Sequence, residues 1–156
     1  MEPESEKARP FQAARLVRLF VSTSAIILAI SGIAKVYSAF GSSRVLGFAD
    51  PIFGVRFGNL FLAVGLAEIV VAALCLVDKH LRAAPPVVAS LATGFLIYRI
   101  GLWGMDWKRP CSCLGILTDQ LHISPQLADN FMKVLLAYLF FGSYSLLFWQ
   151  WKKSNQ

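Results

Sequence analysis

Two cysteines separated by one serine, Cys111 and Cys113, are the residues of this chain whose type and spacing most directly suggest chemistry. A disulfide between them would need the backbone to bend at Ser112. Such a bond is strained, and strained disulfides exchange readily with other thiols. Lys108 and Arg109 precede this cysteine pair, and their positive charge favours the reactive thiolate. The pattern suggests a redox-active dithiol; the structural alternatives are a fixed bridge that shapes the loop and two reduced, inert cysteines.

A metal site is the second chemical interpretation of the same segment. The cysteine pair could bind zinc or copper together with His122 and Asp119, since these metals accept thiolate and imidazole ligands. The spacing matches no standard zinc motif, so we favour no metal here. The third cysteine, Cys75, falls near the far end of an apolar run that would span roughly 30 Å as a helix. We expect it to be a buried, inert thiol that cannot reach the pair.

Apolar runs long enough to cross a membrane make up most of the remaining sequence. Of 156 residues, 56% are hydrophobic and 15% are charged, which is more apolar surface than one small soluble core buries. One helical crossing takes roughly 20 apolar residues. We therefore predict an all-α integral membrane protein, a four-transmembrane-helix bundle in the lipid bilayer. The predicted helices are at about 16–37, 57–77, 85–105 and 125–150.

Other segments precede or connect these helices. Residues 1–14 are polar and are expected to form a cytoplasmic tail before the membrane domain, 15–151. The basic start of the first helix also resembles a signal peptide, but its apolar run is longer than is usual there, so we predict an uncleaved helix. Residues 37–56 mix glycine, serine and aromatic residues, as an interfacial loop does. Residues 106–124 form an outer loop that carries the cysteine pair.

The positions of lysine and arginine predict the orientation. With a cytoplasmic N-terminus, eight of the fifteen basic residues lie on the cytoplasmic side, namely Lys7, Arg9, Arg15, Arg18, Lys79, Arg82, Lys152 and Lys153. Four crossings give an N-in/C-in topology and put the cysteine loop outside, where disulfides persist. The net charge of +6 does not indicate nucleic-acid binding, because the basic residues fall at the ends of apolar runs.

Three charged residues fall within or at the edge of the predicted helices: Lys35, Glu68 and Arg99. A charge inside a membrane is costly unless it faces the bundle interior and has a partner. These residues therefore either form an ion pair that fixes helix packing or line a polar pocket beneath the cysteine loop. Small residues that include Gly32 and Gly65 would let the first two helices approach closely.

Three stretches together resemble the DoxX-like membrane proteins, and more closely their MauE (methylamine utilisation protein) branch. They are Ser31-Gly32-Ile33-Ala34-Lys35, Gly65-Leu66-Ala67-Glu68 and Cys111-Ser112-Cys113-Leu114-Gly115, and their order and spacing cover about residues 19–148. The resemblance implies a four-helix protein of the bacterial inner (cytoplasmic) membrane that is linked to periplasmic thiol and disulfide chemistry. The family's cysteines match Cys111 and Cys113, its lysine matches Lys35 and its glutamate matches Glu68. Leu114 stands where the family often has an aromatic residue.

Together these observations predict a membrane thiol-disulfide oxidoreductase, or an electron-transfer partner, that acts on a periplasmic thiol protein through the cysteine pair. A quinone is a candidate electron acceptor, by analogy with other four-helix proteins that generate disulfides. The main alternative is a non-catalytic subunit of a larger membrane complex, in which the aromatic first loop is a contact surface. The aromatic residues of that loop are Phe40, Phe48, Phe53 and Phe57. A small-molecule carrier is a third hypothesis, supported only by the buried charges.

Overall fold

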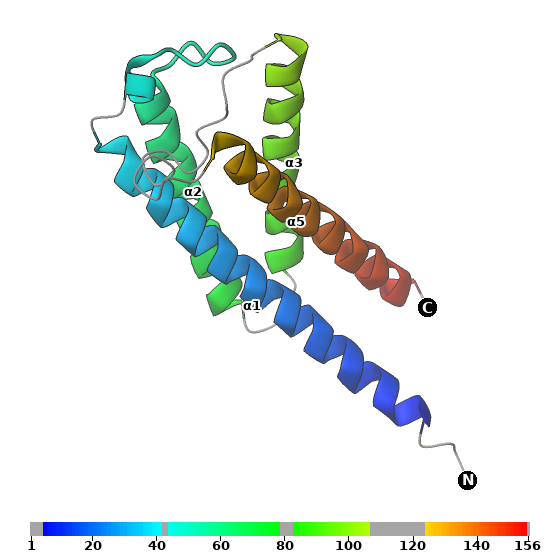
Figure 1. Cartoon of the computed structure of the whole chain (residues 1–156). Coiled ribbons are helices and arrows are strands. Elements are labelled where there is room, and N and C mark those ends of the chain that lie inside the picture. Colours follow the sequence, from blue (N-terminus) through cyan, green and yellow to red (C-terminus); the bar gives the residue numbers. More distant parts are fainter. Residues whose placement is uncertain (1–4, 42–43, 79–82, 107–123, 156) are drawn as a thin grey trace.

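Four long α-helices make up most of the described chain (Figure 1). The structure is a computed structural model that describes residues 5–41, 44–78, 83–106 and 124–155. The helices are α1 (Ser5–Ala39), α2 (Phe57–Val77), α3 (Ala84–Gly104) and α5 (Pro125–Ser154), and a short 3-10 helix, η1 (Arg44–Gly47), follows α1. Each of these four helices contains a segment long and apolar enough to cross a membrane. The predicted all-α class with four membrane-length helices is thus confirmed for the described residues.

Local sequence signals account for where the later helices begin. Pro85 and Pro86 lie in the first turn of α3, where an amide hydrogen has no helical partner to lose. Pro125 begins α5 after Ser124, whose side chain accepts a hydrogen bond from the backbone N–H of Leu127 at 3.4 Å. Proline in the first helical turn is thus the start signal shared by both helices.

The first helix is longer than the sequence suggested. α1 begins at Ser5 rather than at about residue 16, so most of the segment expected to be a polar tail is helical. Alanine, glutamate, lysine and arginine, which are strong helix formers, dominate this stretch, and the helix continues through Pro10.

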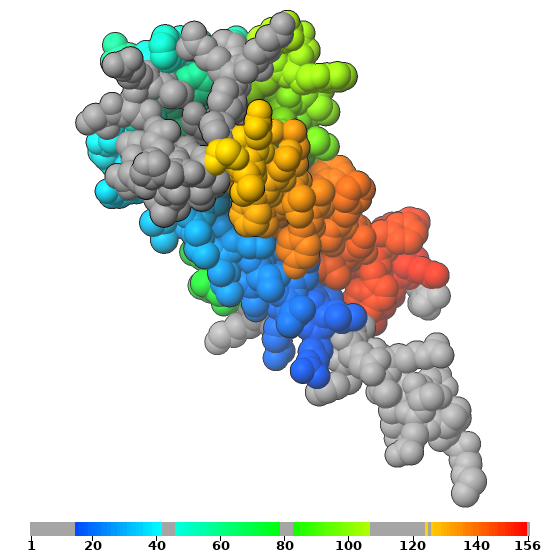
Figure 2. Space-filling model, viewed as in Figure 1, coloured from blue at the N-terminus to red at the C-terminus, as the bar shows by residue number. Residues whose placement is uncertain are grey.

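The helices associate as two pairs. α1 packs closely against α2, α3 packs mainly on α5, and the contacts between the two pairs are fewer. Figure 2 shows α5 at the front of the molecule, between α1 and α3. One apolar core joins the pairs and includes Leu28 of α1, Val71 of α2, Val88 of α3 and Leu139 of α5.

The outward faces of the helices are apolar as well. Large hydrophobic side chains are exposed on every helix, among them Ile30, Val70, Ile97 and Phe141. A surface of this kind would be an aggregation liability in water. It suits a lipid bilayer, in agreement with the membrane-length helices.

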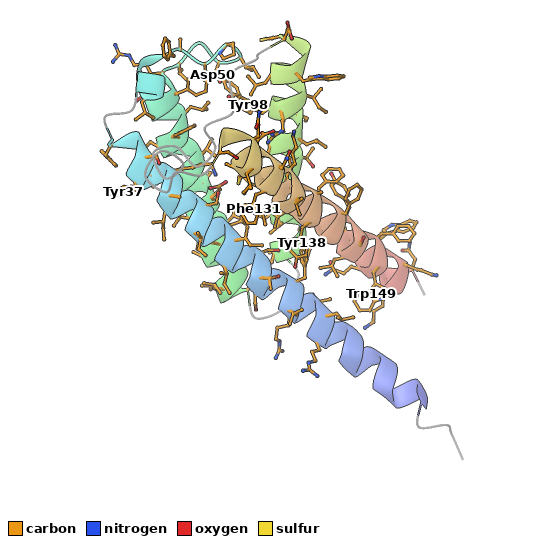
Figure 3. The ribbon with its side chains drawn as sticks, viewed as in Figure 1. Tyr37, Asp50, Tyr98, Phe131, Tyr138 and Trp149 are labelled. Atoms are coloured by element: carbon orange, nitrogen blue, oxygen red, sulfur yellow. The ribbon has the colours of Figure 1, made fainter. Side chains whose placement is uncertain are left out.

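Two aspartates attach α3 to the neighbouring connections. At its start, the Asp78 carboxylate at the end of α2 accepts hydrogen bonds from the backbone N–H groups of Ala83 and Ala84, at 2.8 and 3.0 Å. Near its other end, Tyr98 donates its hydroxyl hydrogen to the carboxylate of Asp50, in the connection between α1 and α2 (Figure 3). That connection is therefore part of the packed structure, although its composition is typical of an interfacial loop.

Candidate functional site: a buried ion pair and the flanks of the cysteine segment

The cysteine pair lies outside the described residues, as do His122 and Asp119 of the alternative metal site. The helices that flank this segment are described. α3 ends at Gly104 and α5 begins at Pro125, and both of these termini lie toward the end of the bundle that carries the connection between α1 and α2 (Figure 1). Cys75, near the C-terminal end of α2, is a buried free thiol toward the opposite end.

Lys35 of α1 and Glu68 of α2 form a buried ion pair. The Lys35 ammonium donates to Oε1 and Oε2 of Glu68, at 2.7 and 2.9 Å, and to the hydroxyl of Ser31 at 2.6 Å. The two charged side chains are only 8% and 2% exposed. An ammonium group carries three N–H donors, so these three acceptors use all of them. The charges are thus paired and hydrogen-bonded, as burial in an apolar bundle requires.

Two glycines bring α1 and α2 close enough for this ion pair to form. A Cβ atom added to Gly32 would lie 2.7 Å from the backbone oxygen of Gly65. Lys35 and Glu68 each follow one of these glycines by three residues, so they sit on either side of the contact. Helical side chains lean toward the N-terminus of their own helix, and α1 and α2 run in opposite directions (Figure 1). The lysine and the glutamate therefore lean toward each other.

Helix α3 also contributes to the surroundings of the ion pair. The Lys35 nitrogen lies 5.8 Å from the centroid of the Phe95 ring, within the range of a cation–π interaction. Through this contact α3, which packs mainly on α5, also touches α1 at the level of the ion pair.

Arg99, one turn beyond Phe95, does not join Lys35 and Glu68. Its guanidinium group pairs with Asp129 of α5 instead, and the ammonium of Lys133 lies 2.8 Å from the other carboxylate oxygen of Asp129. The three charged residues singled out from the sequence thus belong to two separate clusters. Asp129 was not predicted as a site residue. Its position four residues before Lys133 on a predicted helix was the signal that could have identified it as an ion-pair partner.

The geometry of the ion pair decides what Lys35 can bind. A quinone carbonyl would have to displace an oxygen of Ser31 or Glu68, because the ammonium has no further N–H donor. The described residues at Lys35 therefore do not fit a quinone. These residues are suited to a structural role, in which the ion pair links α1 to α2.

Comparisons with known proteins identify no relative. No protein-family model, curated protein or solved structure matches the chain. The likeness to the DoxX and MauE proteins stays a prediction from three sequence stretches. Two of these, 31–35 and 65–68, are the stretches that meet at the contact between Gly32 and Gly65.

Proposed function

We propose that the chain is a multi-pass protein of the bacterial inner membrane, of the DoxX and MauE type, with both termini in the cytoplasm and the cysteine pair on the periplasmic side. Support comes from the even number of membrane-length helices among the described residues. Basic residues provide further support: Arg15 and Arg18 precede the apolar part of α1, and Lys152 and Lys153 lie in the last turn of α5. These helix ends lie away from the flanks of the cysteine segment (Figure 1), as expected for cytoplasmic ends.

In this proposal the protein is a thiol-disulfide oxidoreductase, or an electron-transfer partner, for a periplasmic thiol protein. The observation that carries it is the one-residue spacing of Cys111 and Cys113 in the sequence between α3 and α5, two membrane-length helices. The ends of these helices that flank this sequence lie toward one end of the bundle (Figure 1). A one-residue spacing favours a strained, exchangeable disulfide over a structural one.

The exchange needs no group beyond the cysteine pair and the partner's two thiols. A partner thiolate attacks one sulfur of the disulfide between Cys111 and Cys113, which breaks that bond and forms a mixed disulfide. The partner's second thiolate then attacks the partner sulfur of the mixed disulfide and releases the remaining cysteine. The partner loses two electrons and two protons, and the cysteine pair gains both as two thiols.

The bundle supports this function by fixing the helix ends on either side of the cysteine segment. Arg99 lies near the end of α3 and Asp129 near the start of α5, and their ion pair links these two ends. The bond between Tyr98 and Asp50 attaches the same end of α3 to the first connection. A reactive loop held at both ends loses less conformational freedom when a partner docks.

Serine substitution tests the proposal directly. We expect a Cys111→Ser, Cys113→Ser double variant to assemble in the membrane but to change the redox state of at least one periplasmic thiol protein, measured by alkylation and gel mobility. The Cys75→Ser variant is the matched control and should leave all redox states unchanged. With the cysteine pair intact, replacing the second thiol of the periplasmic partner by serine should trap its mixed disulfide with Cys111 or Cys113. Unchanged redox states in an assembled double variant would rule out the oxidoreductase.

One observation favours the alternative of a non-catalytic subunit in a larger membrane complex. Phe40, Phe48 and Phe53 of the first connection are exposed, whereas Phe57 is buried at the start of α2. The exposed aromatics would then be a contact surface. Under this alternative, a Phe40→Ala, Phe53→Ala variant loses co-purifying subunits, while the double serine variant keeps them.

A further inference from the structure

The cluster of Arg99, Asp129 and Lys133 carries more positive than negative charge. Two cations share one carboxylate, so the three side chains together have a net charge of +1. Arg99 and Asp129 are partly buried, with side chains 24% and 23% exposed, and Lys133 is 55% exposed. An uncompensated charge within a membrane-spanning helix is unfavourable unless it meets an anion or reaches the interface.

The described residues also use only some of the N–H donors at this cluster. A guanidinium group has five N–H donors, and the bond described for Arg99 joins one of its terminal nitrogens to one oxygen of Asp129. Lys133 contacts the other oxygen. Among the residues that the structure describes, Asp129 thus occupies both cations through single contacts, and each cation keeps N–H donors for a second acceptor.

The cluster lies at the depth where headgroups are expected. Arg99 is five residues from the end of α3, or about 7.5 Å along the axis. Asp129 is four residues from the start of α5, or about 6 Å. Lys133 leans toward the N-terminus of α5, which is the same end. Trp103, one turn after Arg99 on α3, is 84% exposed, and tryptophan is enriched at the headgroup layer.

We infer that Arg99 and Lys133 bind the phosphate of an anionic phospholipid headgroup at the seam between α3 and α5. Arginine matches phosphate with two parallel N–H bonds, and lysine adds a point charge. A headgroup with one negative charge would neutralise the cluster. The exposed apolar side chains of Ile97 and Ile100 on α3 would contact the acyl chains. The inference requires that the helices span a membrane and does not depend on the cysteine chemistry.

Lipid titration of the full chain in detergent tests this site. We expect phosphatidylglycerol to raise the thermal midpoint, while phosphatidylcholine and inorganic phosphate at equal concentration do not. The Lys133→Gln variant should need about fivefold more phosphatidylglycerol for the same shift, since one lysine near a lipid phosphate contributes roughly that factor. Lys153→Gln is the matched control: it removes a lysine at the other end of the same helix and should behave like the unchanged protein.

A variant that should bind phosphatidylglycerol more tightly makes the test sharper. Asp129→Asn frees both cations from the carboxylate, so it should need less phosphatidylglycerol than the unchanged protein. Equal losses in the Lys133→Gln and Lys153→Gln variants would overturn the inference, because they would show only general attraction to anionic lipid. An equal shift of the thermal midpoint with phosphatidylcholine would also overturn the inference. An equal shift with inorganic phosphate would overturn the lipid assignment, because the site would then bind a free anion.

Discussion

Gly32 of α1 and Gly65 of α2 meet backbone to backbone, and a Cβ atom on either would lie less than 3 Å from the carbonyl oxygen of the other. This contact sets how closely the two helices approach. It also sets the depth of the ion pair, because Lys35 and Glu68 follow the two glycines at equal spacing.

Replacing Gly65 with alanine should therefore destabilise the protein. The added methyl group would push against the Gly32 carbonyl, the Val36 side chain and Cβ of Lys35, at a cost of about 1–3 kcal/mol. The free energy of unfolding in detergent measures the effect. Gly94→Ala is the control, because a Cβ atom there meets nothing within 4 Å and alanine favours the helix. Equal effects of the two substitutions would contradict the close contact.

Removing one partner of the buried ion pair should destabilise the protein more than removing both partners. Glu68→Leu or Lys35→Met alone leaves one buried charge without its partner, and we expect each to lower the free energy of unfolding by about 3–5 kcal/mol. The double variant leaves no charge and should recover most of that loss. A double-mutant cycle provides the measurement. Additive losses would show that the two side chains do not interact.

Removing the hydroxyl of Tyr98 should loosen the first connection. Tyr98→Phe leaves the Asp50 carboxylate bonded to the backbone N–H groups of Ile52 and Phe53. The connection between α1 and α2 therefore keeps its local turn but loses its hydrogen bond to α3. We expect a loss of about 1.5–3 kcal/mol, as for other hydrogen bonds to a charged group, and faster proteolysis within residues 46–56. Tyr37→Phe, at an exposed tyrosine, is the control. Unchanged proteolysis would mean that the bond does not hold the connection.

The contact between α1 and α5 can be tested by a compensating pair. A Cβ atom on Gly142 would overlap the ring of Phe20, so Gly142→Ala should destabilise the protein by about 1–3 kcal/mol. Phe20→Leu removes the ring atoms that clash. The double variant should then be more stable than the sum of the two single effects predicts. Strict additivity would indicate that Gly142 does not face Phe20.

Much of the helical framework could be predicted, because apolar length and proline position are local properties. The sequence places the second helix at about 57–77, and α2 spans Phe57–Val77. The partner of Arg99 could not be predicted in this way. It depends on how α3 is rotated relative to α5, which residue spacing along one helix does not determine. Asp50 falls in the segment predicted only as an interfacial loop, because its bond to Tyr98 links positions far apart in sequence.

The two aspartates that flank α2 have a joint effect on α3. Asp78 is bonded to the first residues of α3 and Asp50 to Tyr98 near its end, so α3 is attached at two heights to the chain on either side of one helix. Because α2 has a fixed length, sliding α3 along the bundle would break both attachments at once. The axial register of α3 is thereby set by the length of α2. The height at which α3 ends, at Gly104, is set in the same way.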